Sequence, residues 1–258
     1  MAQRKVWGGV IKMVGESIKT YIQGMDKKLE GGIPRGSVVL LCGPAGSLKS
    51  TIALNLMYNH CVETGENALY ISLEQSRKSL IEQMKRFGKD IEAISDRMII
   101  LDLGWIRKEM KSMSEDKSVP TPLWVIEGKN WIETIRKYLK KYVNEMKITL
   151  FTLDSLNALY AMTEFKNPRA ELFYFFEDLR TANVTSFLIL EVDMGEVRNF
   201  GPYGVESFLA DGIIHLSLER INRTVGRYIS VLKMRKVKHS TDYYPLLVDS
   251  SGIRILER

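Results

Sequence analysis

The segment GPAGSLKST, at 43–51, has the residue types that hold phosphate groups. A glycine-rich turn between a strand and a helix exposes successive backbone N–H groups, and the helix N-terminus adds positive potential. Lys49 is then placed to reach the β- and γ-phosphates of ATP, and the Ser50 hydroxyl to ligate Mg²⁺. The predicted nucleotide-binding residues are Gly43, Pro44, Ala45, Gly46, Ser47, Leu48, Lys49, Ser50 and Thr51.

Leu48 departs from the usual phosphate-loop pattern. The pattern G-x-x-x-x-G-K-[ST] has glycine immediately before the lysine, and here that residue is leucine. A side chain at this position crowds the phosphate side or shifts the turn. We therefore expect nucleotide binding to survive and turnover to be slow.

Two carboxylates end apolar runs elsewhere in the chain. Asp154 ends ITLFTLD, where it is placed to hold the water shell of Mg²⁺. Glu74 ends NALYISLE, where it is placed to polarise the water that attacks the γ-phosphate. The alternatives are an Asp that caps the next turn and a Glu that favours the dipole of a following helix.

Apolar runs alternate with helical patterns, which predicts βαβ units and an α/β fold with a mainly parallel sheet. The predicted strands are 37–43, 67–74, 97–103, 148–154 and 186–192, and the predicted helices are 49–62, 76–88, 130–145 and 169–182. The tail has short strands joined by turns, which we expect to be antiparallel and to extend the same sheet. Residues 104–129 are polar and contain two prolines, so we expect a surface excursion there.

The composition favours one globular domain of the cytoplasm. The chain has 258 residues, and no apolar run is long enough to span a bilayer, so stable membrane insertion is not expected. Cys42 and Cys61 lie in apolar surroundings and are predicted to be buried free thiols. We expect an amphipathic appendage at 1–19 and the domain at 20–258. The net charge of +6 permits an anionic partner without requiring one.

Four segments in order resemble the KaiC-like branch of the RecA superfamily of ATPases. They are TYIQGMDKKLEGGIPRGSVVLLCGPAGSLKST, ISLEQS, LFTLDSL and VLKMRKVKHS. The resemblance implies a RecA-like P-loop domain and homo-oligomers, as hexameric rings or filaments, with ATP between subunits. It implies that Lys233 and Arg235 act catalytically on a neighbour's γ-phosphate and that His239 lies near that nucleotide's sugar or base. Gln75 replaces a second glutamate, and Lys236 stands where the family usually has glycine.

The leading hypothesis is an ATPase that hydrolyses ATP at subunit interfaces, coupled to assembly or to a partner. A second is a RecA-paralogue-type protein of recombination or repair that binds single-stranded DNA through 193–207. In that loop Arg198, Phe200 and Tyr203 would stack on bases, although its acidic residues oppose backbone binding. A third is a nucleotide-sensing scaffold with little hydrolysis.

Overall fold

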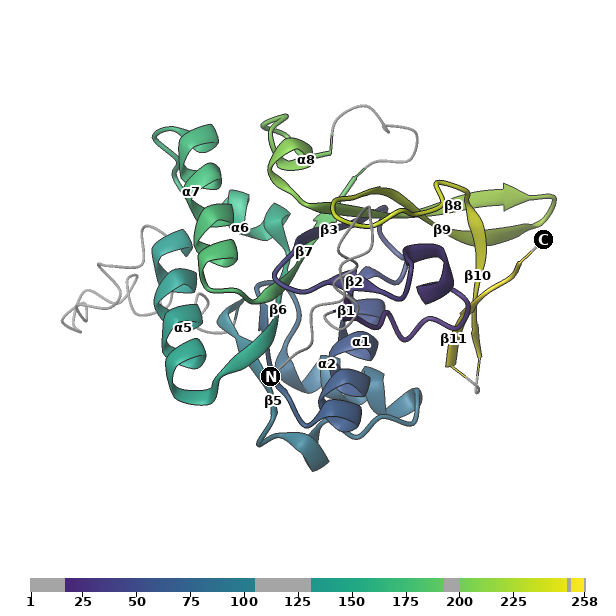
Figure 1. Cartoon of the computed structure of the whole chain (residues 1–258), viewed down its shortest axis with the longest axis horizontal. Helices are drawn as coiled ribbons and strands as arrows, with labels where there is room; N and C mark the ends of the chain where they lie inside the picture. The colour runs from purple at the N-terminus through teal and green to yellow at the C-terminus, as the bar shows by residue number, and fades with distance from the viewer. Residues whose placement is uncertain (1–16, 105–130, 193–199, 250–251, 258) are drawn as a thin grey trace, which may run out of the picture.

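The computed structural model describes residues 17–104, 131–192, 200–249 and 252–257. Its centre is a nine-stranded sheet in the order β11-β10-β9-β8-β3-β7-β6-β4-β5 (Figure 1). The strands are β3 (Val38–Gly43), β4 (Asn67–Ser72), β5 (Met98–Asp102), β6 (Ile148–Asp154), β7 (Thr185–Glu191), β8 (Gly212–Ile221), β9 (Thr224–Met234), β10 (Tyr244–Asp249) and β11 (Gly252–Ile255). The expected α/β class with a mainly parallel sheet is confirmed.

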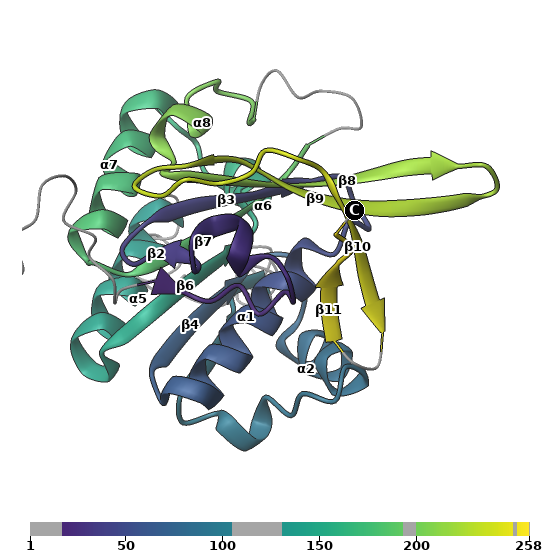
Figure 2. The ribbon, with the colours of Figure 1, turned by 45° about the vertical axis from the view of Figure 1, so that its right-hand side comes forward.

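The tail strands pair antiparallel with one another and extend the same sheet, as expected. β8 pairs parallel with β3, and only the contacts of β8 with β9, of β9 with β10 and of β10 with β11 are antiparallel. β8 therefore belongs to the parallel part of the sheet. The β8–β9 hairpin extends beyond the body of the domain (Figure 2).

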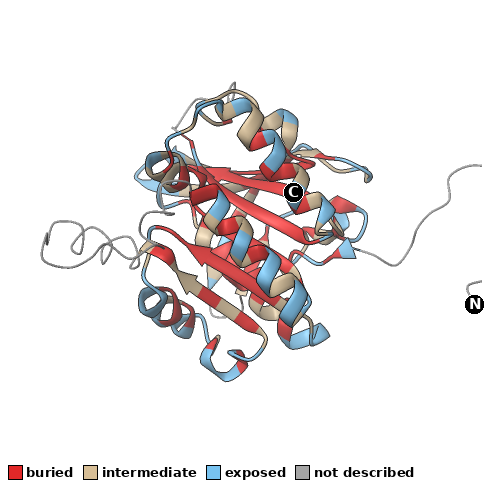
Figure 3. Cartoon of the chain, turned by 90° about the vertical axis from the view of Figure 1, so that its left-hand side faces the viewer, coloured by how far each residue is buried: buried red, intermediate tan, exposed pale blue. Residues whose placement is uncertain are grey.

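Helices cover both faces of the sheet. The described helices are α1 (Lys49–Thr64), α2 (Arg77–Arg86), α5 (Trp131–Met146), α6 (Leu156–Met162), α7 (Pro168–Thr181) and the short α8 (Glu206–Leu209), with 3-10 turns η1 (Asp26–Leu29) and η2 (Glu92–Ile94). Figure 3 shows buried strands between helices whose outer faces are exposed. One apolar core lies on the α1 and α2 side, and a second lies under α5, α6 and α7. Both cysteines are buried and free, as predicted.

Local signals explain where several helices begin and end. The side chains of Ser76, Ser155 and Asn167 accept hydrogen bonds from backbone N–H groups in the first turns of α2, α6 and α7, which stabilises those ends. Pro168 follows at the first position of α7, where no N–H is needed. Gly65 ends α1 in the left-handed conformation that glycine adopts without strain.

The N-terminal part of the described chain closes the first core. The short strand β1 (Ser17–Ile18) pairs with β2 (Ile33–Pro34), and Ile18 has no exposed surface. Of the expected appendage at 1–19, residues 17–19 are thus in contact with the folded chain, while 1–16 lie outside the described residues. Most of the excursion expected at 104–129 also lies outside them.

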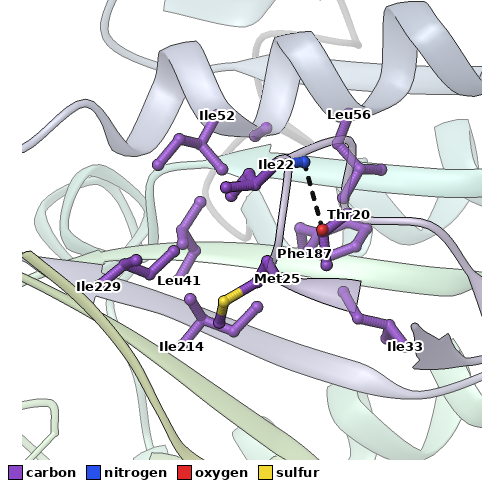
Figure 4. Close-up of a pocket in the computed structure, with 11 residues that line it drawn as sticks. Thr20, Ile22, Met25, Ile33, Leu41, Ile52, Leu56, Phe187, Ile214 and Ile229 are labelled. Carbon is purple, nitrogen blue, oxygen red and sulfur yellow. Dashed lines mark hydrogen bonds between the residues drawn. The ribbon is translucent and has the colours of Figure 1, made fainter. Parts of the chain in front are cut away.

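A cavity of ≈ 10 Å³ lies between α1, β3 and this segment (Figure 4). Ile22, Met25 and Ile33 line it from the segment side. The hydroxyl of Thr20 is occupied, because it donates to Asp26 at 2.7 Å. With almost no free volume and an apolar lining, this cavity is a packing gap of the core.

An ion-pair cluster lies at the amino ends of β3, β4 and β6. The Glu66 carboxylate accepts hydrogen bonds from Arg35 at 2.9 and 2.8 Å and from the Thr149 hydroxyl at 2.7 Å, and His60 Nε2 lies 2.8 Å from Oε2. Burial opposes ionisation of Glu66, but these hydrogen bonds outweigh it and lower its pKa from 4.5 to about 2.

Replacing Glu66 by Gln is expected to lower the free energy of unfolding by about 1.5–3 kcal/mol at pH 7. The folded pKa lies below the unfolded one, so the contribution of Glu66 is complete above pH 4.5 and is lost as the pH falls from 4.5 toward about 2. Urea unfolding of both proteins across this range measures it. Glu63→Gln, which removes an exposed ion pair with Lys19, is the control and should change stability by less than about 1 kcal/mol. A Glu66→Gln effect that is the same at every pH would contradict this account.

Candidate functional site

The carboxyl ends of β3, β7, β6 and β4 meet at one edge of the sheet and form a cleft of ≈ 310 Å³. The register places Glu191 beside Gly43 and Asp154 beside Ser72. The residues that line the cleft are Ala45, Gly46, Leu48, Lys49, Ser50, Thr51, Glu74, Gln75, Gln83, Asp154, Ser155, Ile189 and Glu191. The phosphate-loop residues and both predicted carboxylates are thus brought together, although their sequence positions lie far apart.

Lys49 is a cation held largely out of water, with 8% of its surface exposed. Its Nζ donates hydrogen bonds to the carbonyl oxygens of Gly43 and Pro44, both at 2.8 Å. Burial lowers the pKa of Lys49, while the negative charges of the cleft, with Glu191 first, oppose that shift. A ligand oxygen that takes the place of these carbonyls would meet a positive charge that is weakly solvated.

Leu48 and Lys236, which stand where the phosphate-loop pattern and the resembling family have glycine, both have backbone dihedrals typical of glycine. Leu48 has φ 77° and Lys236 has φ 73°, both in the left-handed region that side chains with a Cβ adopt at a cost. The Leu48 side chain is partly buried and packs against the first core. The substitution therefore adds backbone strain and leaves the turn geometry in place.

Asp154 is a buried carboxylate, and the hydroxyl of Tyr70 donates a hydrogen bond to its Oδ2. Burial raises the pKa of Asp154, while hydrogen bonds from Tyr70 and Ser50 oppose that shift. Tyr70 is fully buried on β4, so its hydroxyl needs a partner within the protein. Tyr70 fixes the orientation of the carboxylate next to Ser50.

Glu74 is held by the segment that follows Asp154. The Ser155 hydroxyl donates to Glu74 Oε1 and also accepts from the Ala158 N–H, at 3.1 Å, as the N-cap of α6. The Ser72 hydroxyl donates to the Gln75 carbonyl at 2.7 Å and accepts from the Gln75 N–H at 3.1 Å, which fixes the turn that carries Glu74. Glu74 thus lines the cleft and also lies just before the N-cap of α2.

Lys233, Arg235 and His239 do not line the cleft. Lys233 Nζ donates to the carbonyls of Ser207 and Ala210, at 2.8 and 2.6 Å. Arg235 is exposed and bonds Asp211 at 3.1 Å. Lys233 of β9 and Arg235, in the turn after β9 ends at Met234, therefore both contact the segment that joins α8 to β8. The alternation of a strand does not account for this, because Arg235 lies beyond the strand.

Of the aromatic residues proposed to stack on nucleic-acid bases, Phe200 is buried and Tyr203 is partly buried. Phe200 is 7% exposed and lies edge-on to His215, and the Tyr203 ring packs edge-on against Tyr160 and Phe165. Glu206, counted as part of the acidic loop, is fully buried and accepts from the Tyr160 hydroxyl at 3.1 Å. The expectation that Phe200 is free to stack is wrong; Arg198 lies outside the described residues.

Several residues near the cleft carry no clear signal in the sequence. Glu191 lines the cleft because β7 ends between β3 and β6, and Tyr70 contacts Asp154 because β4 lies beside β6. Ser155 follows a strand at a position typical of a helix N-cap. Gln83 of α2 donates to the Thr51 hydroxyl at 2.6 Å, and Arg227 of the β8–β9 hairpin lies 3.4 Å from the Gly46 carbonyl oxygen. These contacts tie the phosphate loop to α2 and to β9.

A family model described as "ATPase: KaiC" matches residues 18–258. This chain belongs to the KaiC family of ATPases. Membership of this family supports an ATP-binding ATPase of the RecA type. The mainly parallel sheet, with a cleft at the carboxyl ends of its strands, agrees with that fold. In the part of the chain that is described, no helix has both the length and the apolar character needed to cross a membrane.

The similar proteins fall into two length classes. UPF0273 protein MJ1359 of Methanocaldococcus jannaschii is 30% identical over 243 residues, which cover 92% of this chain and 94% of that protein. Circadian clock protein KaiC2 of Synechocystis sp. is 28% identical over 239 residues, and this chain spans only 39% of its length. The crystal structure of KaiC-like protein PH0186 from Pyrococcus horikoshii OT3 matches with a TM-score of 0.77 at 26% identity, covering 94% of this chain and 99% of that one.

The left-handed backbone at Leu48 predicts an unusual order of stability for two variants. Leu48→Gly and Leu48→Ala both remove the side-chain packing, but only glycine removes the Cβ that a positive φ disfavours. Leu48→Gly is therefore expected to be more stable than Leu48→Ala by roughly 1–2 kcal/mol. Chemical denaturation measures the difference. If the alanine variant is as stable as the glycine variant, the backbone at residue 48 is not left-handed.

Proposed function

We propose that this protein binds ATP in the cleft and hydrolyses it slowly, at an interface between two copies of the chain. The proposal rests above all on the meeting of Lys49, Glu74 and Asp154 at one end of a parallel sheet, around a loop built for phosphate. A strand-to-helix loop supplies backbone N–H groups, the lysine supplies charge, and the carboxylates supply the groups that position metal and water.

The residues present fit a magnesium ion. Ser50 and Asp154 offer a hydroxyl and a carboxylate oxygen, the hard donors that Mg²⁺ prefers, and they lie in hydrogen-bonding contact with each other. The buried charge of Asp154 also favours a cation nearby. When bound with ATP, Mg²⁺ would neutralise charge on the β- and γ-phosphate oxygens.

The chain's own residues have separate tasks. Lys49 would exchange the Gly43 and Pro44 carbonyls for phosphate oxygens, which brings a weakly solvated charge to the terminal phosphate. Glu74 would orient and polarise the attacking water, with its Oε1 held by the Ser155 hydroxyl. The nucleoside would lie in the adjoining hollow of ≈ 140 Å³, which shares Thr51 with the cleft and is lined by Met84 and Phe87.

The position of Lys233 and Arg235 supports a site shared between copies. Neither residue lines the cleft, yet Arg235 is exposed. Charge that spreads over the γ-phosphate oxygens is stabilised by a cation delivered from a neighbouring subunit. We assign Lys233 and Arg235 to that role, and His239 to the neighbour's sugar or base. We propose a hexameric ring or filament as the assembly, as the resemblance to KaiC-like ATPases implies.

Three variants test the assignment by ATP binding and phosphate release, measured with Mg²⁺. Lys49→Ala is expected to lose both, because it removes the cation that grips the phosphates. Glu74→Gln is expected to keep binding within about threefold and to lose most turnover, at least about 100-fold. Lys140→Ala removes an exposed lysine of α5 and is the matched control, which should behave as the native protein.

Two results would contradict the proposal. Binding and turnover that survive in Lys49→Ala would move the nucleotide to another site. The second result is that only the native protein binds ATP but its turnover is no higher than that of Lys49→Ala. The protein would then be a nucleotide-sensing scaffold and not an ATPase.

A further inference from the structure

Glu191 is an acidic residue at a place where an anion is expected to bind. It is the last residue of β7 and lines the cleft, and its Oε2 lies 4.0 Å from Lys49 Nζ. Its side chain is about half exposed, at 52%. The carboxylate makes no part of the proposed metal or water contacts, which belong to Asp154 and Glu74.

The strand order shows which part of the nucleotide Glu191 faces. β7 lies between β3, which leads into the phosphate loop, and β6, which ends in Asp154. The terminal phosphate has to lie between the loop and the catalytic carboxylates, and therefore above the end of β7. The α- and β-phosphates lie further back along the loop, toward the start of α1.

Hydrogen bonds hold the backbone of Glu191 in place, so the end of β7 cannot shift to move the carboxylate away from Lys49. The Glu191 N–H donates to Asn157 Oδ1 at 2.7 Å, and Asn157 Nδ2 donates to the Glu191 carbonyl at 3.2 Å. The next residue, Val192, donates its N–H to the Gly43 carbonyl at 3.2 Å. Only side-chain torsions are left to move the carboxylate away from an incoming phosphate.

The charges around Lys49 affect a triphosphate more than a diphosphate. Glu191, Asp154 and Glu74 are the carboxylates that act electrostatically on this one lysine. A γ-phosphate that binds Lys49 would have the Glu191 carboxylate as a near neighbour, because its Oε2 lies 4.0 Å from the same Nζ and is drawn to the same positive charge. A diphosphate ends one phosphate earlier and meets less of this repulsion, because the interaction falls with distance.

We propose that Glu191 is a specificity-determining residue of this site: its carboxylate competes with the terminal phosphate for Lys49 and weakens the binding of nucleoside triphosphate more than that of diphosphate. The inference rests on the proposed function, since it assumes that ATP binds in the cleft. It brings the affinities for ATP and ADP closer together, so that site occupancy by ATP responds to the ratio of the two nucleotides.

The test is calorimetric titration of the full chain with a non-hydrolysable ATP analogue and with ADP, both with Mg²⁺. Glu191→Gln is expected to bind the analogue about 10-fold more tightly and ADP less than about threefold more tightly than the native protein does. Glu191→Asp keeps the charge on a shorter side chain, so its affinity for the analogue should fall between those of the native protein and Glu191→Gln. The difference between analogue and ADP should shrink at about 0.5 M salt, because the repulsion is screened.

Glu63→Gln is the matched control for net charge. It removes one carboxylate of similar exposure at the far end of α1, about 20 Å along the helix from the phosphate loop, and should leave both affinities unchanged. Equal changes in the affinities for analogue and ADP in Glu191→Gln, or weaker binding of the analogue, would overturn the role of Glu191. Nucleotide binding by the native protein would in that case still support the nucleotide site. Native protein that binds neither nucleotide would overturn the proposed function itself.

Discussion

The arrangement of the cleft depends on Lys49, a cation that the fold holds almost completely out of water. A buried ammonium group is unfavourable unless oxygen atoms surround it, and here two loop carbonyls and the carboxylates of three neighbouring strand ends do so. Parallel strands make this possible because their carboxyl ends share one edge. The Lys49 ammonium, held there by these oxygens, offers a phosphate a positive charge that is already partly desolvated.

Each of the two carboxylates assigned to metal and water is held by a residue of the adjacent strand or of the segment that follows it. Tyr70 of β4 holds Asp154 of β6, and Ser155 after β6 holds Glu74 after β4. The two strands are adjacent, so the bonds cross between them in both directions. Such reciprocal support limits side-chain motion at a site where small displacements are costly. The Glu66 cluster fixes the same strands at their amino ends.

Short-range patterns in the sequence are sufficient for much of this structure. Continuous apolar runs locate the parallel strands within one to two residues, and the loop at 43–51 locates the phosphate site, because strand, turn and helix are contiguous there. The pairing of β8 with β3 cannot be predicted from the sequence, since a run such as DGIIHLSLE is found in both parallel and antiparallel sheets. Tyr70 and Glu191 became visible only with the strand order. The burial of Phe200 and Glu206 likewise depends on contacts with distant residues.

The central claim is that Lys49 of one copy and Arg235 of another serve the same ATP. Mixing Lys49→Ala and Arg235→Ala proteins, and measuring phosphate release before and after subunit exchange, tests it directly. Each variant alone should be inactive, and the exchanged mixture should regain activity at about a quarter of its interfaces, where both native residues meet. A mixture no more active than the two separate variants would contradict a shared site.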